Sequence, residues 1–303
     1  MDVNCSLLCA SGAAYDIDPT CGVYTPDILF SKNVAFQPPG PIVINNTGTE
    51  RINACLVGRN TNGIIVAFRG TLPADTYDGF ADWVEDLFAE PLPCHGFPGK
   101  VHSGFCADIN ALFPAVLAAV KSLDPISTPV YVTGHSKGGA LASLCAYLLS
   151  QAGIRVRQVV TFASPKTGDS GFQAGYQQVI RNQIRYENYG DLVPLVPPED
   201  EFITLLAAIV QRIPEIGPRL AALIREAANW DYQPVGAEWF IESRENKFKV
   251  ILDESAIFQV LDFIVNLGKH LDAPLTALGN AHSLHCNLGY MSGTCPLTIC
   301  SST

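Results

Sequence analysis

The sequence predicts an α/β fold with a mainly parallel central sheet that is covered by helices on both faces. Strand-like runs rich in β-branched residues alternate with stretches of helical composition along most of the chain. This order is typical of parallel strands joined by helical crossovers. A G-x-S-x-G pentapeptide lies at one strand-to-helix junction. With 303 residues, 48% of them hydrophobic, the chain can bury a large core, so we expect one domain over residues 1–303.

The expected elements follow one another after a cysteine-bearing, loop-rich start. Strands are predicted at residues 42–44, 51–57, 63–68, 129–133, 156–162 and 184–188, and helices at residues 108–123, 138–150 and 170–179. Residues 201–230 form a predicted helical insertion, because they are rich in Leu, Ile and Ala and are interrupted by two prolines. In such a sheet, ligands bind beyond the carboxyl ends of the strands.

The candidate nucleophile is Ser136, at the centre of the pentapeptide Gly134-His135-Ser136-Lys137-Gly138. An apolar strand precedes the motif and a helix follows it. The turn between them brings the flanking backbones close together, so the positions two before and two after the serine must be glycine. The bent backbone exposes the hydroxyl and places the next amide at a helix N-terminus. The alternative is a structural small residue in a tight turn.

The candidate acid is Asp191, which follows a predicted strand in a proline-rich loop. In this architecture the acid follows the nucleophile along the chain and the histidine comes last. Asp200 and Asp253 also follow Ser136, but neither ends a strand-like run so clearly. The alternative for Asp191 is a helix or turn cap.

The candidate base is His282, with His285 as the alternative. Of the histidines beyond Asp191, His270 falls in a helical stretch, whereas His282 and His285 share one loop. Ser283 between them could cap a helix that follows, which would leave His282 just before that helix and His285 in its first turn. This arrangement favours His282.

The predicted oxyanion donors come from two loops. The strand at residues 64–68 ends in Arg-Gly-Thr, so Thr71 could offer its amide and its hydroxyl, and Lys137 offers the amide next to the nucleophile. Taken alone, an Arg-Gly-Thr sequence is only the end of a strand. Acyl transfer by a serine needs neither a metal ion nor another cofactor, so we expect none.

Composition and charge limit the classes of ligand and partner that the chain can bind. The formal net charge of -10 excludes a phosphate-binding surface and nucleic acid. The longest apolar run, residues 202–210, is well short of the roughly 20 residues that span a bilayer, so no transmembrane segment is expected. The substrate is expected to be neutral or apolar.

The ten cysteines indicate an oxidising compartment, because they gather near both ends of the chain. We expect at least one disulfide between these ends and an extracellular location, with the signal peptide absent from this sequence. The alternative is a set of reduced, buried thiols. The expected disulfide joins one of Cys5, Cys9 and Cys21 to one of Cys286, Cys295 and Cys300.

Together these motifs resemble the class 3 lipase family, the fungal-type lipases of the α/β-hydrolase fold. Matching segments lie at residues 68–71, 101–105, 134–142, 161–165, 185–198 and 232–236. The resemblance implies hydrolysis of triacylglycerols or related lipid esters, including at an oil–water interface. It implies Ser136, Asp191 and a late histidine as the catalytic triad, with Thr71 and Lys137 as oxyanion donors.

Two segments depart from the family pattern. Residues 72–80 lie where fungal lipases carry an amphipathic lid helix, but this segment is short and includes Pro and Gly. Residues 201–230, by contrast, look like an insertion. The insertion is either a replacement lid that binds acyl chains or part of the core. A feruloyl-type or short-chain, soluble-ester esterase is therefore an alternative function, and a non-catalytic lipid- or protein-binding member is a third.

Overall fold

The computed structural model describes residues 2–46, 53–71, 85–199, 202–213, 216–244, 247–252, 254–270, 273–286 and 289–299. The predicted lid position at residues 72–80 lies outside the described residues. The same holds for Asp200, Asp253 and Cys300, which the sequence offered as alternatives.

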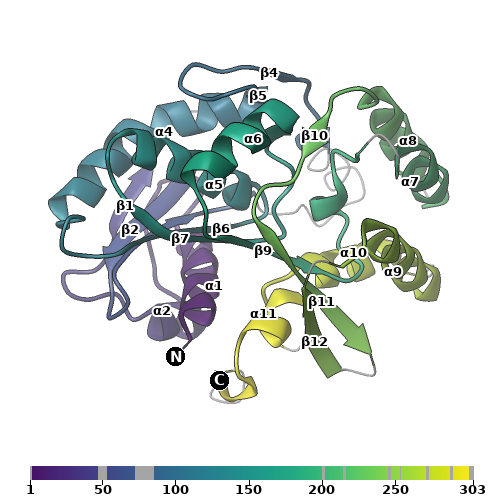
Figure 1. Cartoon of the computed structure of the whole chain (residues 1–303). Helices are drawn as coiled ribbons and strands as arrows, with labels where there is room; N and C mark the ends of the chain where they lie inside the picture. Colours follow the sequence, from purple (N-terminus) through teal and green to yellow (C-terminus); the bar gives the residue numbers. More distant parts are fainter. Residues whose placement is uncertain are drawn as a thin grey trace.

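One twisted eight-stranded sheet forms the centre of the molecule (Figure 1). The five central strands run parallel to one another, and both edges are antiparallel. The α/β prediction is therefore confirmed, with antiparallel additions at the edges. In spatial order the strands are β1 (Ile42–Asn45), β2 (Ala54–Arg59), β3 (Ile64–Phe68), β6 (Val130–His135), β7 (Val156–Phe162), β9 (Gln183–Asn188), β11 (Ala237–Arg244) and β12 (Lys247–Leu252).

Helices cover both faces of the sheet (Figure 1). One face carries α4 (Ser103–Ser122), α5 (Lys137–Gln151) and α6 (Ser170–Val179), and the other carries α1 (Val3–Ala13), α2 (Ile28–Val34) and α11 (Gly289–Thr294). The buried apolar residues accordingly form two clusters, one on each side of the sheet. A small second sheet joins β10 (Tyr232–Gln233), β8 (Gly168–Asp169), β5 (Lys100–His102) and β4 (Pro91–Pro93).

The start of the chain is a buried helix, so the expectation of a loop-rich start was wrong. Every residue of α1 from Asn4 to Ala13 is buried, and the helix packs across β3, β6 and β7. Its Ser, Cys and Gly residues are weak helix formers. Burial against the sheet stabilises this helix, and local propensity does not reveal it.

Among the described helices, α4 alone is long and apolar enough to cross a membrane by length and composition. In this structure its apolar side packs into the core through Phe105, Ile109, Leu112 and Val116, which are all buried. The amphipathic pattern of a core helix accounts for its composition.

The predicted insertion forms two short helices, α7 (Ile203–Val210) and α8 (Gly217–Glu226), on the side of the molecule where α9 (Ala256–Lys269) and α10 (Pro274–His282) also lie (Figure 1). Leu206 and Val210 are fully buried, and Leu220 is 1% exposed. All three belong to the same apolar cluster as the residues of α4 and α5. The packing favours a core role for the insertion over a detachable lid.

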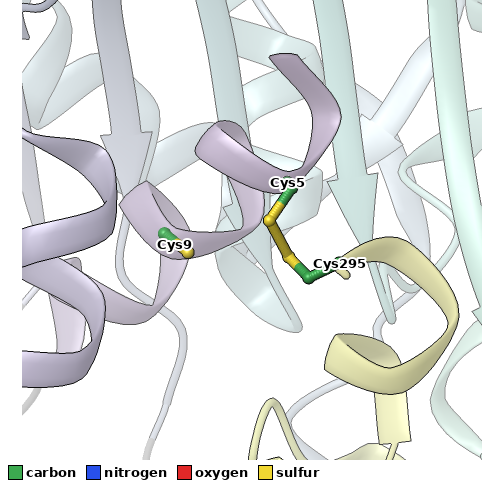
Figure 2. Close-up of side chains that lie close together, drawn as sticks. All are labelled: Cys5, Cys9 and Cys295. Carbon is green, nitrogen blue, oxygen red and sulfur yellow. A yellow bond between two sulfur atoms is a disulfide. The ribbon is translucent and has the colours of Figure 1, made fainter. Parts of the chain in front are cut away.

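A disulfide joins the two ends of the chain, as predicted. Cys5 on α1 is bonded to Cys295, which directly follows α11, across 290 residues of sequence (Figure 2). A second disulfide, Cys94–Cys106, was not predicted. Cys9 lies beside the first pair, and the three sulfurs are within 4.8 Å of one another. Two of them are bonded to each other, so the group does not offer three thiolate ligands. Burial raises the pKa of the Cys9 thiol to about 12.

Candidate active site

Ser136 lies at a sharp bend between β6 and α5. Its backbone has φ 58° and ψ -135°, a left-handed conformation that is unusual for a residue with a side chain. A Cβ atom at Gly134 would overlap the carbonyl oxygen of Gly138, and a Cβ atom at Gly138 would overlap the carbonyl oxygen of Phe68. The two glycines are therefore required by close backbone packing, which is the reason inferred from the sequence.

The Ser136 side chain is buried at the N-terminus of α5. Its hydroxyl makes no hydrogen bond within the part of the chain that the structure describes. Such a buried hydroxyl normally has a partner. At the end of a helix, with its Oγ uncommitted, this serine can meet a reacting carbonyl.

Asp191 follows β9 and lies in a turn after Gly190, whose φ is +73°. The carboxylate is 4% exposed and accepts three kinds of hydrogen bond. His282 Nδ1 lies 3.0 Å from Oδ2 and 3.1 Å from Oδ1, and the amide of Val193 donates to Oδ1 at 3.0 Å. Tyr290 donates its hydroxyl to Oδ2 at 2.6 Å. The carboxylate is thus fixed between a histidine and a tyrosine.

Tyr290 is a part of this site that the sequence analysis did not identify. Its ring is fully buried, and its hydroxyl accepts a hydrogen bond from the amide of Asn188 at 3.1 Å. Burial, followed by the charge of Asp191, raises its pKa well above the usual value. Tyr290 therefore remains a hydrogen-bond donor to the carboxylate.

The structure separates the two candidate histidines. His282 is the last residue of α10, is 6% exposed and bonds Asp191, whereas His285 is exposed. The capping argument was wrong in its detail, because Ser283 ends α10 and no helix begins directly after it. Its hydroxyl accepts from the amide of His285 in a local turn, and the next helix starts at Gly289.

The end of α10 is held by the ends of two central strands, β6 and β9, which flank β7. His135 Nε2 donates to the carbonyl of His282 at 2.8 Å, and Asn188 Nδ2 donates to the carbonyl of Ala281 at 2.7 Å. The rings of His135 and His282 lie 4.5 Å apart between centroids. Because His135 directly precedes Ser136, this contact brings the Asp191–His282 pair to the serine.

The predicted oxyanion donors lie on both sides of the serine. A Cβ atom at Gly70 would lie 3.1 Å from the Cβ atom of Ser136, so the loop that carries Thr71 passes directly beside the serine. Thr71 is half-buried, and Lys137 is the first residue of α5. The Lys137 ammonium forms an ion pair with Asp108 at 2.6 Å. Its charge is therefore neutralised by α4, and only its amide is a candidate donor.

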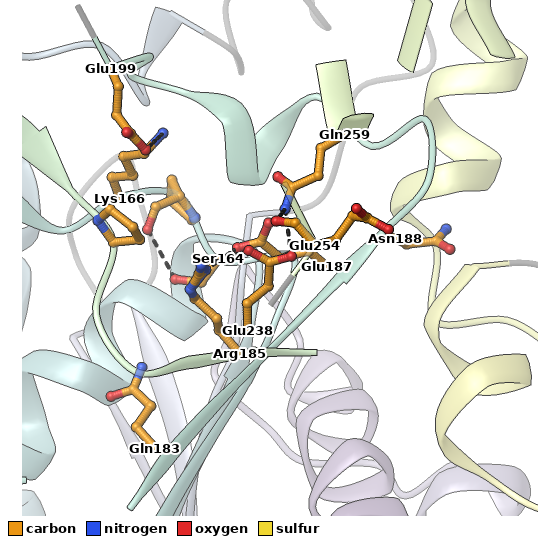
Figure 3. Close-up of polar contacts among 12 residues, drawn as sticks. Ser164, Lys166, Gln183, Arg185, Glu187, Asn188, Glu199, Glu238, Glu254 and Gln259 are labelled. Carbon is orange, nitrogen blue, oxygen red and sulfur yellow. Dashed lines mark hydrogen bonds and ion pairs between the residues drawn. The ribbon is translucent and has the colours of Figure 1, made fainter. Parts of the chain in front are cut away.

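A second polar cluster is formed by side chains of β9, β11 and α9 (Figure 3). Arg185 donates to Glu187 and to Glu238, each at 2.8 Å, and Gln259 of α9 donates to Glu238. Desolvation by burial raises the pKa of both glutamates, and that of Glu238 rises to about 7. We name Arg185, Glu187, Glu238 and Gln259 the Arg185 cluster.

The fold and this site define an α/β-hydrolase, and solved structures share the architecture. A structure titled M37 lipase is similar with a TM-score of 0.60 at 17% identity, covering 93% of this chain and 96% of that one. The Rhizomucor miehei lipase in its propeptide complex is similar with a TM-score of 0.57 at 21% identity, covering 86% and 75%. The predicted α/β-hydrolase fold is thus confirmed.

Residues 65–201 match the family model of the class 3 lipases. A lipase from Caenorhabditis elegans is 46% identical over 199 residues, covering 63% of this chain and 54% of that protein. The Rhizomucor miehei lipase is 34% identical over 153 residues, covering 46% and 39%. The chain spans about half the length of these relatives or less. The resemblance inferred from the motifs is confirmed.

Proposed function

We propose that the chain is a serine carboxylester hydrolase that cleaves lipid esters through an acyl-enzyme intermediate. Ser136 is the nucleophile, His282 is the general base and acid, and Asp191 orients the histidine. The observation that carries the proposal is the hydrogen bond of Asp191 to His282 Nδ1, next to a serine in a bend between strand and helix.

In the proposed reaction, the Nδ1–H group of His282 donates a hydrogen bond to the Asp191 carboxylate, which stays ionised, so Nε2 is the atom that takes the proton of Ser136. The serine attacks the ester carbonyl, and the amides of Thr71 and Lys137 stabilise the oxyanion. His282 then returns the proton to the leaving alcohol, and water hydrolyses the acyl-serine by the reverse sequence. Thr71, Ser136 and Asp191 lie beyond the carboxyl ends of the central strands β3, β6 and β9, whereas His282 ends α10.

We propose glycerol esters of fatty acids as the substrate class. Relatives are named as secreted mono- and diacylglycerol lipase 1 of Fusarium solani and as phospholipases A1 of Arabidopsis thaliana. An acidic protein with net charge -10 favours a neutral lipid over an anionic one. The Cys5–Cys295 and Cys94–Cys106 disulfides support an extracellular location.

The test is Ser136→Ala, assayed with nitrophenyl esters from acetate to palmitate and with an emulsified triacylglycerol. We expect a loss on the order of 10⁵-fold or more in kcat, because the members of such a triad act as a unit. Ser150→Ala, at the far end of the same helix, is the matched control and is expected to keep full activity. Activity within a few per cent of the unmutated protein would exclude Ser136 as the nucleophile. A preference for acetate over palmitate would favour the soluble-ester esterase.

A further inference from the structure

A chain of hydrogen bonds connects Tyr15 to the backbone of His282. Tyr15 lies in a 3₁₀ turn, η1 (Ala14–Asp16), that continues α1 at the start of the chain. Its hydroxyl is 2.7 Å from His135 Nδ1, and the opposite nitrogen of that ring, Nε2, is 2.8 Å from the carbonyl oxygen of His282. The Tyr15 hydroxyl also packs directly against Gly70, where an added Cβ atom would overlap it.

The proton positions in this chain follow from the chemistry of its two ends. A carbonyl oxygen can only accept a hydrogen bond. His135 Nε2 therefore carries a proton and donates a hydrogen bond to the carbonyl oxygen of His282. With its proton on Nε2, the neutral imidazole has a lone pair on Nδ1. The remaining proton, on the Tyr15 hydroxyl, points to His135 Nδ1, which accepts it as a neutral imidazole.

The surroundings of both rings favour these protonation states. Burial, followed by the neighbouring His282, holds the pKa of His135 well below its usual value. Burial likewise raises the pKa of Tyr15, so the phenol keeps its proton. The titratable groups that face His135 are Tyr15, His282 and Tyr290, and their rings lie 5.7, 4.5 and 6.0 Å away between centroids.

We propose that Tyr15 and His135 are positioning residues. They fix the base His282 relative to the nucleophile Ser136 and to the loop that carries Thr71. The hydrogen bonds link His135, which precedes Ser136, to His282, the proposed base. Tyr15 also packs against Gly70, which precedes the proposed donor Thr71. His282 also ends α10, where a helix leaves its last carbonyl groups without a partner in the helix. The inference rests on the proposed function of these loops.

The physical effect concerns geometry. Without the Tyr15 hydroxyl, His135 gains access to the other neutral tautomer, which presents a lone pair from Nε2 to the His282 carbonyl. This replaces an attraction by a repulsion at the residue that must meet Ser136. Displacements of about 1 Å in such sites cost on the order of 10²-fold in rate. We expect a smaller effect here, because Asn188 still holds the preceding carbonyl.

The test compares two tyrosine variants that each remove one hydroxyl from the N-terminal region. In Tyr15→Phe, kcat is expected to fall about fivefold with KM unchanged, matching the loss of one hydrogen bond of about 1 kcal/mol. Tyr24→Phe is the control, because its partly buried hydroxyl bonds Ser31 and touches none of the three loops. The rate of inactivation by diethyl nitrophenyl phosphate, which reports attack by the serine, is expected to fall with kcat in Tyr15→Phe only.

A second measurement does not depend on how the variants fold. Nitrogen-15 NMR of the unmutated protein, with His135→Gln to assign the signal, is expected to show His135 as the neutral Nε2–H tautomer. An Nδ1–H or doubly protonated ring would overturn the proposal, as would equal kcat in Tyr15→Phe and Tyr24→Phe. If Ser136→Ala keeps its activity, the proposed function fails instead. A full loss in Ser136→Ala with no effect of Tyr15→Phe leaves the function standing and removes the positioning role.

Discussion

The hydroxyl of Tyr290 donates a 2.6 Å hydrogen bond to Asp191, although 99 residues separate them in the sequence. Tyr290 lies on α11, and Cys295 just beyond that helix is bonded to Cys5 on α1. The last segment of the chain is thus held against the sheet from both sides, by a covalent bond and by a buried hydrogen bond to the acid. This arrangement places both ends of the chain at the candidate site.

Tyr290→Phe is expected to lower kcat by roughly tenfold to a hundredfold, because a buried hydrogen bond to a charged group contributes about 1.5–3 kcal/mol. The loss should appear with both short and long esters, since the acid acts on the base and not on the acyl chain. Tyr147→Phe on α5, whose ring packs near Phe172, is the control. Steady-state kinetics on both variants provide the measurement. Unchanged kcat in Tyr290→Phe would mean that the other donors to Asp191 suffice.

The two histidine variants test the choice of base. His282→Ala is expected to lower kcat nearly as far as Ser136→Ala, because it removes the only described histidine that bonds Asp191. His285→Ala, at an exposed position three residues away, should keep most of the activity. Both variants should unfold at temperatures close to that of the unmutated protein. The reverse order of activities would assign the base to His285.

Leu205 and Leu206 are adjacent on α7 but differ in burial, with exposed fractions of 39% and 0%. Leu206→Asp places a carboxylate in the core and is expected to destabilise the fold by about 4 kcal/mol or more, with activity lost on esters of every chain length. Leu205→Asp should change stability by less than about 1 kcal/mol. Thermal unfolding followed by circular dichroism separates the two. Selective loss of long-chain activity in Leu206→Asp, at unchanged stability, would restore an acyl-binding role.

The Arg185 cluster predicts a dependence of stability on pH. The pKa of Glu238 is about 7 in the folded protein, mainly because burial penalises its charged form, and it is ordinarily near 4.5. A raised pKa means that the folded state binds the proton more tightly. The stabilisation is therefore fully present below about pH 4.5 and is lost as the pH rises through about 7.

Glu238→Gln, which keeps the shape without the titration, should remove this contribution. The melting temperature of the unmutated protein should fall by a few degrees more than that of the variant between pH 5.5 and 8.5, at about 2–4 °C per kcal/mol. Glu226→Gln, at an exposed position on α8, is the control and should follow the unmutated protein. Parallel slopes for Glu238→Gln and the unmutated protein would show that Glu238 is ionised throughout this range.

The local sequence was sufficient for the features that depend on near neighbours. The alternation of strands and helices predicted β3, β6, β7 and β9 and helices α4 to α6, because both period and composition are local properties, but it did not predict the fifth parallel strand, β11. Gly134 was readable for the same reason, since the clash that excludes a side chain there is with Gly138, four positions away, whereas the clash at Gly138 is with the distant Phe68. Asp191 could be placed because it directly follows a strand.

Other features were decided by contacts between segments that are distant in the sequence. Helix α1 mixes Ala and Leu with weak helix formers such as Ser, Cys and Gly, and it is stabilised by burial against three strands, so the local sequence did not reveal it. The distinction between His282 and His285 required the position of Asp191, 91 residues earlier. The sequence does not indicate which groups the side chains of Tyr15, His135 and Tyr290 bond. Only the tertiary structure brings their hydroxyl and ring nitrogen atoms to the acid and the base, because hydrogen-bond partners are set by distances in space.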